Sequence, residues 1–161
     1  MRDKLKLNTL VVEEGKDIGG TWYWNTYPGA RCDSESFTYG FTFSEKIFKN
    51  WTWKERYPKQ NVILKYLKYF SNELKLKKNI VFNEKVISAK YIEKNNLWKI
   101  QTNNKKKYYT KYLICAVGSL SSINLPKIKG INQFRGQLHH SGRWPKTVSY
   151  THLRAHETKR N

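Results

Sequence analysis

The 161 residues of this chain can bury one ordinary hydrophobic core, and 31 Lys and Arg against 12 Asp and Glu give it a net charge of +19. The cations are scattered among many Asn and Ile residues, a mixture typical of AT-rich coding DNA, so the charge does not predict specific nucleic-acid binding. No apolar run is long enough to span a membrane, and two cysteines without a signal-peptide pattern indicate a reduced, cytoplasmic setting.

The first predicted elements are the end of a helix and a short strand. Residues 1–6 are expected to close the helix, and residues 7–12 form an apolar run, typical of a strand, that ends at Glu13. In open sheets that bind dinucleotides, an acidic residue at the end of the second strand binds the ribose hydroxyls. The Gly-x-Gly-x-x-Gly turn that holds the pyrophosphate before such a strand does not occur in the sequence. We therefore expect a piece of a longer dinucleotide-binding protein.

A helix and a meander follow. Residues 58–76 are predicted to form a helix opened by Pro58, with one apolar face. That face consists of Ile63, Leu67, Phe70 and Leu74. Residues 80–82 are predicted as a short strand, and three strand-like runs separated by Asn-rich turns predict an antiparallel meander. Those runs are residues 86–92, 97–102 and 107–110, and the lysines at 105–107 are expected to be a solvated hairpin turn.

The last predicted strand is Tyr112–Val117, which stops at Gly118. A continuous apolar run of this kind is typical of a strand covered on both faces, so we expect it to return to a parallel sheet. The sequence therefore predicts an α/β fold in which a meander is inserted before this strand.

Glycines and aromatic residues gather between the first strand and the helix. Gly19 and Gly20 allow a ligand to approach the backbone closely, and Thr21 offers a hydroxyl beside them. The aromatic side chains that follow suit the pocket of a flat ligand. They are Trp22, Tyr23, Trp24 and Tyr27. Each ring taken alone is more simply a core or turn residue, so the functional interpretation depends on their occurrence as a run.

Two separated segments carry a family pattern. One joins Gly19–Asn25 to Tyr27–Asp33, and the other is Phe134-x-Gly136-x-x-x-His140-x-x-x-Trp144-Pro145. Together they resemble the Baeyer-Villiger monooxygenases. The first is similar to the segment that those enzymes wrap around FAD, and the second to the fingerprint that distinguishes them from related flavin monooxygenases. The resemblance covers residues 4–146.

The resemblance implies a fold and a domain organisation. The fold class is α/β, a partial FAD-binding Rossmann-like domain of the two-dinucleotide-binding flavoprotein type with an inserted antiparallel β-meander. Residues 1–130 are implied to be this partial domain, and residues 131–147 a linker toward an NADP-binding domain outside the chain. Residues 148–161 resemble a translated sequencing adapter. His152 and His156 in this tail have the spacing of metal ligands but no third ligand, so no metal site is expected.

The resemblance also implies residue roles. Asp33 is implied to lie near the flavin and to hold an active-site arginine supplied by the downstream half; a turn-capping role for Asp33 and a surface position for Arg31 remain open. Val117 stands where the family has threonine, so only its backbone could contact the cofactor. The residues implied to contact FAD are Glu13, Gly19, Gly20, Thr21, Trp22, Trp24, Tyr27, Asp33, Val117 and Gly118.

In the second segment, Phe134 and Trp144 are bulky anchors, Gly136 permits a tight turn, and His140 titrates near neutral pH. The resemblance implies that this linker couples nicotinamide binding to flavin chemistry, with His140 in a positioning role. A histidine satisfied within a loop is the alternative. His139 lies outside the fingerprint and is expected to be incidental.

The implied activity uses FAD and NADPH to insert one oxygen atom from O2 beside a ketone carbonyl, giving an ester or lactone. A flavin monooxygenase that oxidises soft nitrogen or sulfur atoms is the nearest alternative; Trp144 followed by Pro145 argues against it, because that relative closes the fingerprint with a smaller aromatic residue. A basic, non-enzymatic binding module is the alternative of another class. The isolated chain is expected to be inactive, and the sequence does not predict its substrate or oligomeric state.

Overall fold

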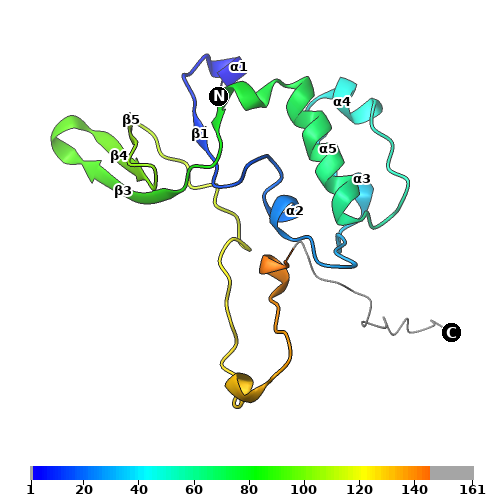
Figure 1. Ribbon diagram of the computed structural model, residues 1–161. Helices are drawn as coiled ribbons and strands as arrows, with labels where there is room; N and C mark the ends of the chain where they lie inside the picture. The colour runs from blue at the N-terminus through cyan, green and yellow to red at the C-terminus, as the bar shows by residue number, and fades with distance from the viewer. Residues whose placement is uncertain (1, 146–161) are drawn as a thin grey trace.

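The computed structural model describes residues 2–145, which form a mixed α/β structure. Helices α2 to α5 lie on one side of a two-stranded parallel pair, and a three-stranded antiparallel sheet projects on the other side (Figure 1). The segment that follows the sheet, residues 111–145, contains only two short 3-10 helices, η3 (Ile131–Gln133) and η4 (Ser141–Arg143). The adapter-like tail, residues 148–161, lies outside the described residues.

The parallel pair consists of β1 (Val11–Val12) and β2 (Ile80–Val81), with Val11 opposite Ile80. It follows α1 (Arg2–Leu5), the helix end predicted at residues 1–6. The strand predicted at residues 7–12 is therefore shorter than expected. Residues 7–10 find no ladder partner among the described residues, and without a ladder an apolar run does not become a strand.

Helix α5 (Gln60–Glu73) provides the centre of the hydrophobic core. It begins two residues after Pro58, because Lys59 is still extended. Ile63 and Tyr66 are fully buried, and burial of each is worth about 2 kcal/mol of unfolding free energy. The rest of the predicted apolar face is half-buried, so the face points inward as expected but centres on Ile63 and Tyr66.

Aromatic rings cover α5, a cluster that the sequence did not predict. They come from the chain around α3 (Ser36–Tyr39) and α4 (Glu45–Lys49). The Tyr66 hydroxyl accepts a hydrogen bond from the backbone N–H of Phe41 at 2.7 Å. The Tyr66 ring centroid lies 4.8 Å from that of Trp53 and 5.2 Å from that of Trp51. Tyr66 thus joins the α3–α4 layer to the helix through both packing and a hydrogen bond.

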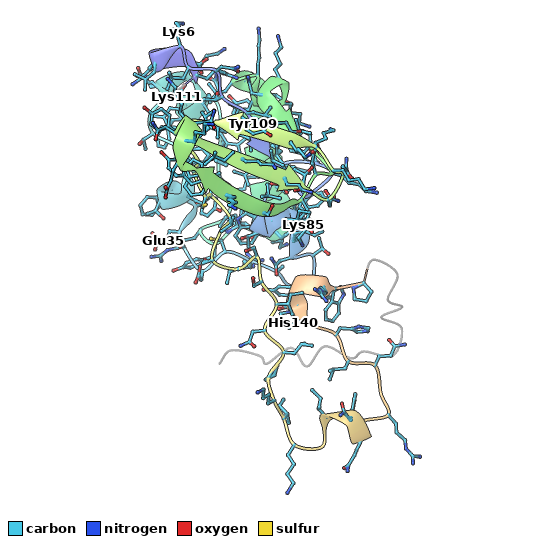
Figure 2. The ribbon with its side chains drawn as sticks, turned by 90° about the vertical axis from the view of Figure 1, so that its left-hand side faces the viewer. Lys6, Glu35, Lys85, Tyr109, Lys111 and His140 are labelled. Atoms are coloured by element: carbon cyan, nitrogen blue, oxygen red, sulfur yellow. The ribbon has the colours of Figure 1, made fainter. Side chains whose placement is uncertain are left out.

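The predicted meander forms with the predicted bounds. Strands β3 (Val86–Ile92), β4 (Leu97–Thr102) and β5 (Lys107–Thr110) pair antiparallel in sequence order. The 3-10 turn η2 (Glu93–Asn95) joins the first two strands. Figure 2 looks onto the outer face of this sheet, where Tyr109 is exposed.

A buried carboxylate joins the meander to the parallel pair. Glu84, 1% exposed, accepts hydrogen bonds from Thr102 Oγ1 at 2.7 Å, Tyr108 OH at 3.1 Å and Lys106 Nζ at 2.8 Å. Its backbone N–H donates to the carbonyl of Glu13 at 3.0 Å. The bonds from Lys106 and Thr102 outweigh burial and hold the pKa of Glu84 below its ordinary value. Lys106 is therefore an ion-pair partner and not simply part of a solvated turn.

The strand predicted at Tyr112–Val117 is absent. In the described ranges no strand pairs with this run, and Val117 is 74% exposed. A central strand needs hydrogen-bonded neighbours, and β1 is paired with β2 alone. Residues 112–114 instead line an open groove beside Leu5 and Leu7.

The loop between β1 and α2 is clamped by Asp17. Its Oδ1 lies 2.7 Å from Lys77 Nζ on η1 (Leu76–Asn79), and its Oδ2 lies 3.0 Å from Lys68 Nζ on α5. Partial burial raises the pKa of Asp17, but the bonds from the two lysines and from the Ile18 backbone outweigh it and lower this pKa to about 2.

Replacing Glu84 by Gln should destabilise the chain. The amide lacks the charge that pairs with Lys106 and has one acceptor oxygen for three donors, so we expect the melting temperature to fall by about 5 °C or more. Glu14→Gln is the control, because the Glu14–Lys85 pair is more than half exposed on both sides and should matter little. Equal melting temperatures for the two variants would contradict the role given to Glu84.

The Asp17 clamp predicts a pH dependence. Because the folded-state pKa is depressed, the stabilisation is present above the unfolded pKa near 3.8 and is lost as the pH falls through about 2. The unfolding free energies of wild type and Asp17→Asn, measured in urea, should differ by about 1 kcal/mol at pH 7 after allowance for solvent screening. The difference should shrink as the pH falls below the unfolded pKa near 3.8 and should be small once the pH is below about 2. A difference that stays constant across this range would rule the clamp out.

Candidate functional site

A glycine turn leads into α2 (Thr21–Trp24), a single helical turn. Gly19 and Gly20 both have positive φ, 134° and 50°. The φ of Gly19 favours glycine, and a Cβ at this position would lie 2.5 Å from Leu64 Cδ1 of α5, against which the turn packs. A Cβ on Gly20 would meet nothing within 4 Å. The backbone at Gly20 is therefore open to a ligand.

The aromatic side chains of this turn have different surroundings. Trp22 is half-buried, and its Nε1 donates to the hydroxyl of Tyr39 at 2.5 Å. Burial raises the pKa of Tyr39, which keeps this hydroxyl protonated. Trp24 is 47% exposed and meets the Tyr23 ring edge-on with centroids 4.9 Å apart. Trp22 thus anchors the turn, whereas Trp24 presents ring surface to solvent.

The second part of the first motif is a turn followed by a bridge to α5. The Ala30 N–H donates to the carbonyl of Tyr27 at 3.1 Å, and Gly29 has φ 75°, as expected after Pro28 in a type II turn. The backbone then forms an antiparallel bridge between Arg31 and Lys59. This bridge fixes the chain on either side of Arg31 to the start of α5.

The two charged residues of that segment differ. Asp33 is exposed and has no hydrogen bond or ion pair within residues 2–145, so its side chain does not cap the turn. The Arg31 guanidinium donates to Glu55 Oε2 and to the Tyr57 carbonyl, both at 2.5 Å, in an exposed ion pair. Arg31 is therefore a surface charge, the alternative left open above.

Glu13 directly follows β1. Its carboxylate accepts the Gly15 N–H at 2.7 Å through Oε1, and Oε2 has no hydrogen-bond partner in the part of the chain that the structure describes. The Glu13 backbone N–H donates to Val81 at 2.9 Å, which holds the residue in line with the strand. One carboxylate oxygen of Glu13 thus has free acceptor capacity among the described residues.

Val117 and Gly118 are not built into an element. Both are exposed, on the extended segment that leaves the meander, and Gly118 has φ 75°. Since the strand expected before them is absent, the structure gives no contact that joins them to the glycine turn.

The second segment is the returning limb of a long loop that extends from the body, and its His140 end lies nearest the body (Figure 2). A Cβ on Gly136 would lie 2.5 Å from Phe134 Cζ, so the glycine lets the Phe134 ring fold back. His140 Nδ1 accepts the Gly142 N–H at 3.0 Å and caps η4. His139, expected to be incidental, packs edge-on against Trp144 with ring centroids 5.5 Å apart. Trp144 and Pro145 are half-buried.

Sequence reasoning missed one residue of this site, Gln60. Its backbone N–H donates to the Ala30 carbonyl at 2.9 Å, and its side-chain amide donates to the Trp22 carbonyl. Nothing local marks it, because both partners are about 30 or more residues away in the sequence.

Two further features bear on the kind of site. Among residues 2–145, no helix has the length and apolar character needed to cross a membrane. Across the same residues, His, Cys, Asp and Glu side chains form no group of three that could hold a metal ion. His152 and His156 lie outside the described residues.

Similarity to known sequences covers nearly the whole chain. Residues 2–151 match the sequence pattern of the family described as Pyridine nucleotide-disulphide oxidoreductase. Cyclohexanone 1,2-monooxygenase from Acinetobacter sp. is 42% identical over 93% of this chain and 28% of its own length. A Baeyer-Villiger monooxygenase from Pseudooceanicola batsensis is 38% identical over 96% of this chain and 28% of its own. Phenazine N-monooxygenase PhzNO1 from Lysobacter antibioticus is 38% identical over 92% and 28%.

A solved structure is similar to this chain in both fold and sequence. The structure of OTEMO in complex with FAD and NADP superposes with a TM-score of 0.81 at 38% identity, over 89% of this chain and 27% of that one. The chain spans little more than a quarter of the length of the relatives it matches. For the Acinetobacter cyclohexanone 1,2-monooxygenase the share is 28%. The relatives that the chain matches include Baeyer-Villiger monooxygenases, and the chain itself belongs to the pyridine nucleotide-disulphide oxidoreductase family.

Proposed function

We propose that the chain is the FAD-binding part of an FAD- and NADPH-dependent monooxygenase that inserts one oxygen atom from O2 beside a ketone carbonyl, yielding an ester or lactone. The observation that carries this proposal is the glycine turn. Gly19 packs against Leu64 of α5, while Gly20 is open and accepts the backbone N–H of Trp24, whose ring is 47% exposed. A rigid turn with bare backbone and flat aromatic surface suits close contact with a flavin nucleotide.

In this proposal, different residues around the turn contact different parts of FAD. The free oxygen of Glu13 accepts from a ribose hydroxyl, and the Gly19–Thr21 backbone lies against the nucleotide. Trp22, Trp24 and Tyr27 shape the pocket, and Val117 and Gly118 contribute backbone only. When bound, FAD supplies the route by which electrons from NADPH reach dioxygen.

Asp33 has a positioning role in this proposal. An exposed carboxylate without a partner among the described residues suits an arginine from outside this chain. Such a pair would hold the arginine in place and keep Asp33 ionised. The role matches the position of Asp33 directly after the bridge that fixes the chain to α5.

The segment from Phe134 to Pro145 is the proposed linker, with residues 1–130 as the partial FAD-binding domain and residues 131–147 leading to an NADP-binding domain. Because His140 Nδ1 accepts a backbone hydrogen bond, the neutral ring carries its proton on Nε2. His140 therefore presents a donor to its surroundings while its orientation is fixed by the turn.

One relative favours a second candidate activity. Phenazine N-monooxygenase PhzNO1 acts on nitrogen according to its name, and its similarity covers 92% of the present chain. Oxidation of a soft nitrogen atom requires the same FAD and NADPH sites, so the cofactor sites are common to both candidate activities. Ketone oxygenation is preferred because Trp144 and Pro145 complete the fingerprint.

The open backbone at Gly20 predicts a selective loss of FAD. In the complete protein, Gly20→Ala should weaken FAD binding about tenfold or more, because the added methyl group occupies the surface where the nucleotide lies. Gly130→Ala is the matched control, since Gly130 also has positive φ, 82°, but lies outside the proposed FAD contacts. Fluorescence titration of the apoprotein with FAD measures both, and equal affinities would contradict the proposed contact.

Activity of the complete protein distinguishes the candidate functions. With NADPH and a cyclic ketone we expect a lactone, detected by gas chromatography, and little oxidation of a tertiary amine. Amine oxide formed without any lactone would assign the second activity instead. A purified protein that lacks flavin absorbance and binds oligonucleotides with a steep salt dependence would indicate the basic binding module.

A further inference from the structure

Gln60 connects both parts of the candidate flavin surface, defined here as Gly19–Trp24 and Tyr27–Asp33. It is the first residue of α5. Its backbone N–H donates to Ala30 at 2.9 Å in one part, and its side-chain amide donates to the Trp22 carbonyl in the other. Since a carbonyl only accepts, the contact assigns the NH2 group of Gln60 to the Trp22 oxygen.

The α2 turn needs such an anchor. A helix of one turn is unstable alone, because few hydrogen bonds offset the cost of fixing its backbone. The carbonyls at its end also have no following turn to bond with. Thr21 O accepts from Asn25 N at 2.9 Å, and Trp22 O accepts from Gln60. The Gln60 bond therefore satisfies a terminal carbonyl and ties the turn to α5.

The position of Gln60 makes both bonds compatible. The first N–H groups of a helix have no partner inside the helix, so the Gln60 N–H is free to bond with Ala30. Its side chain is half-buried between the two parts and extends from a rigid 14-residue helix. One residue of the helix thus sets the separation between the Trp22 turn and the loop that leads to Asp33.

We infer that Gln60 is a positioning residue of the FAD site: its side-chain amide holds the Gly19–Trp24 turn in register with the Tyr27–Asp33 loop. This inference rests on the proposed function for its consequence, FAD binding, but the positioning itself is a property of the described chain. Loss of the amide releases the turn while leaving the Gln60–Ala30 backbone bond, the Ile63–Tyr66 core and the meander in place.

The first test measures positioning without a cofactor. In the 161-residue chain labelled with 5-fluorotryptophan, Gln60→Met should shift or broaden the 19F signals of Trp22 and Trp24 and leave the signal of Trp98 unchanged. Gln60→Lys keeps a donor and should retain the wild-type signals of Trp22 and Trp24. Gln101→Met is the control, because Gln101 is half-buried on β4 and its side chain makes no hydrogen bond within the described residues. Equal spectra for wild type and Gln60→Met would overturn the inference, as would equal changes in Gln60→Met and Gln60→Lys.

The second test measures FAD affinity in the complete protein. Gln60→Met should weaken FAD binding about tenfold, with Gln60→Lys and Gln101→Met close to wild type. If wild type binds FAD and Gln60→Met binds it equally well, the inference is wrong and the proposed function stands. If wild type binds no FAD, the proposed function fails, and the 19F signals alone decide whether Gln60 positions the turn.

Discussion

Burial of one face of α5 is the interaction on which the rest of the structure depends. Ile63 and Tyr66 are buried, and the Tyr66 hydroxyl accepts a hydrogen bond from Phe41 in the aromatic layer that covers the helix. The same helix packs Leu64 against Gly19 and bonds through Gln60 to both parts of the candidate flavin surface. The site is thus supported by a rigid helix, although its own residues lie in turns that would not be ordered alone.

Acidic residues join elements in a chain with a large excess of cations. Glu84 links the meander to the parallel pair, and Asp17 ties the loop before the glycine turn to α5 and η1. In both places two or more donors converge on one carboxylate, which holds its pKa low and makes the contact insensitive to pH near neutrality. Despite the net charge of +19, local ion pairs at these two carboxylates therefore fix the contacts between elements.

Local patterns in the sequence predicted the elements whose partners are close in the chain. The meander has its predicted bounds because alternation and the turns near Asn96 and Lys105 determine the pairing of neighbouring strands. Tyr112–Val117 has the composition of a buried strand but no neighbour in the described chain, so it stays extended and exposed. The candidate site behaves in the same way. Most of its residues lie in the motif Gly19–Asp33, whereas the Gln60 bond to Trp22 spans 38 positions and has no local pattern.

We propose that the glycine turn and Glu13 form a flavin nucleotide surface supported by α5. The decisive experiment is a crystal structure of the complete protein grown with FAD. We expect the nucleotide against the backbone of Gly19 and Gly20, a ribose hydroxyl on the Glu13 carboxylate, and the Gln60–Trp22 bond intact. FAD bound elsewhere, with the glycine turn and Glu13 in contact with solvent, would contradict it.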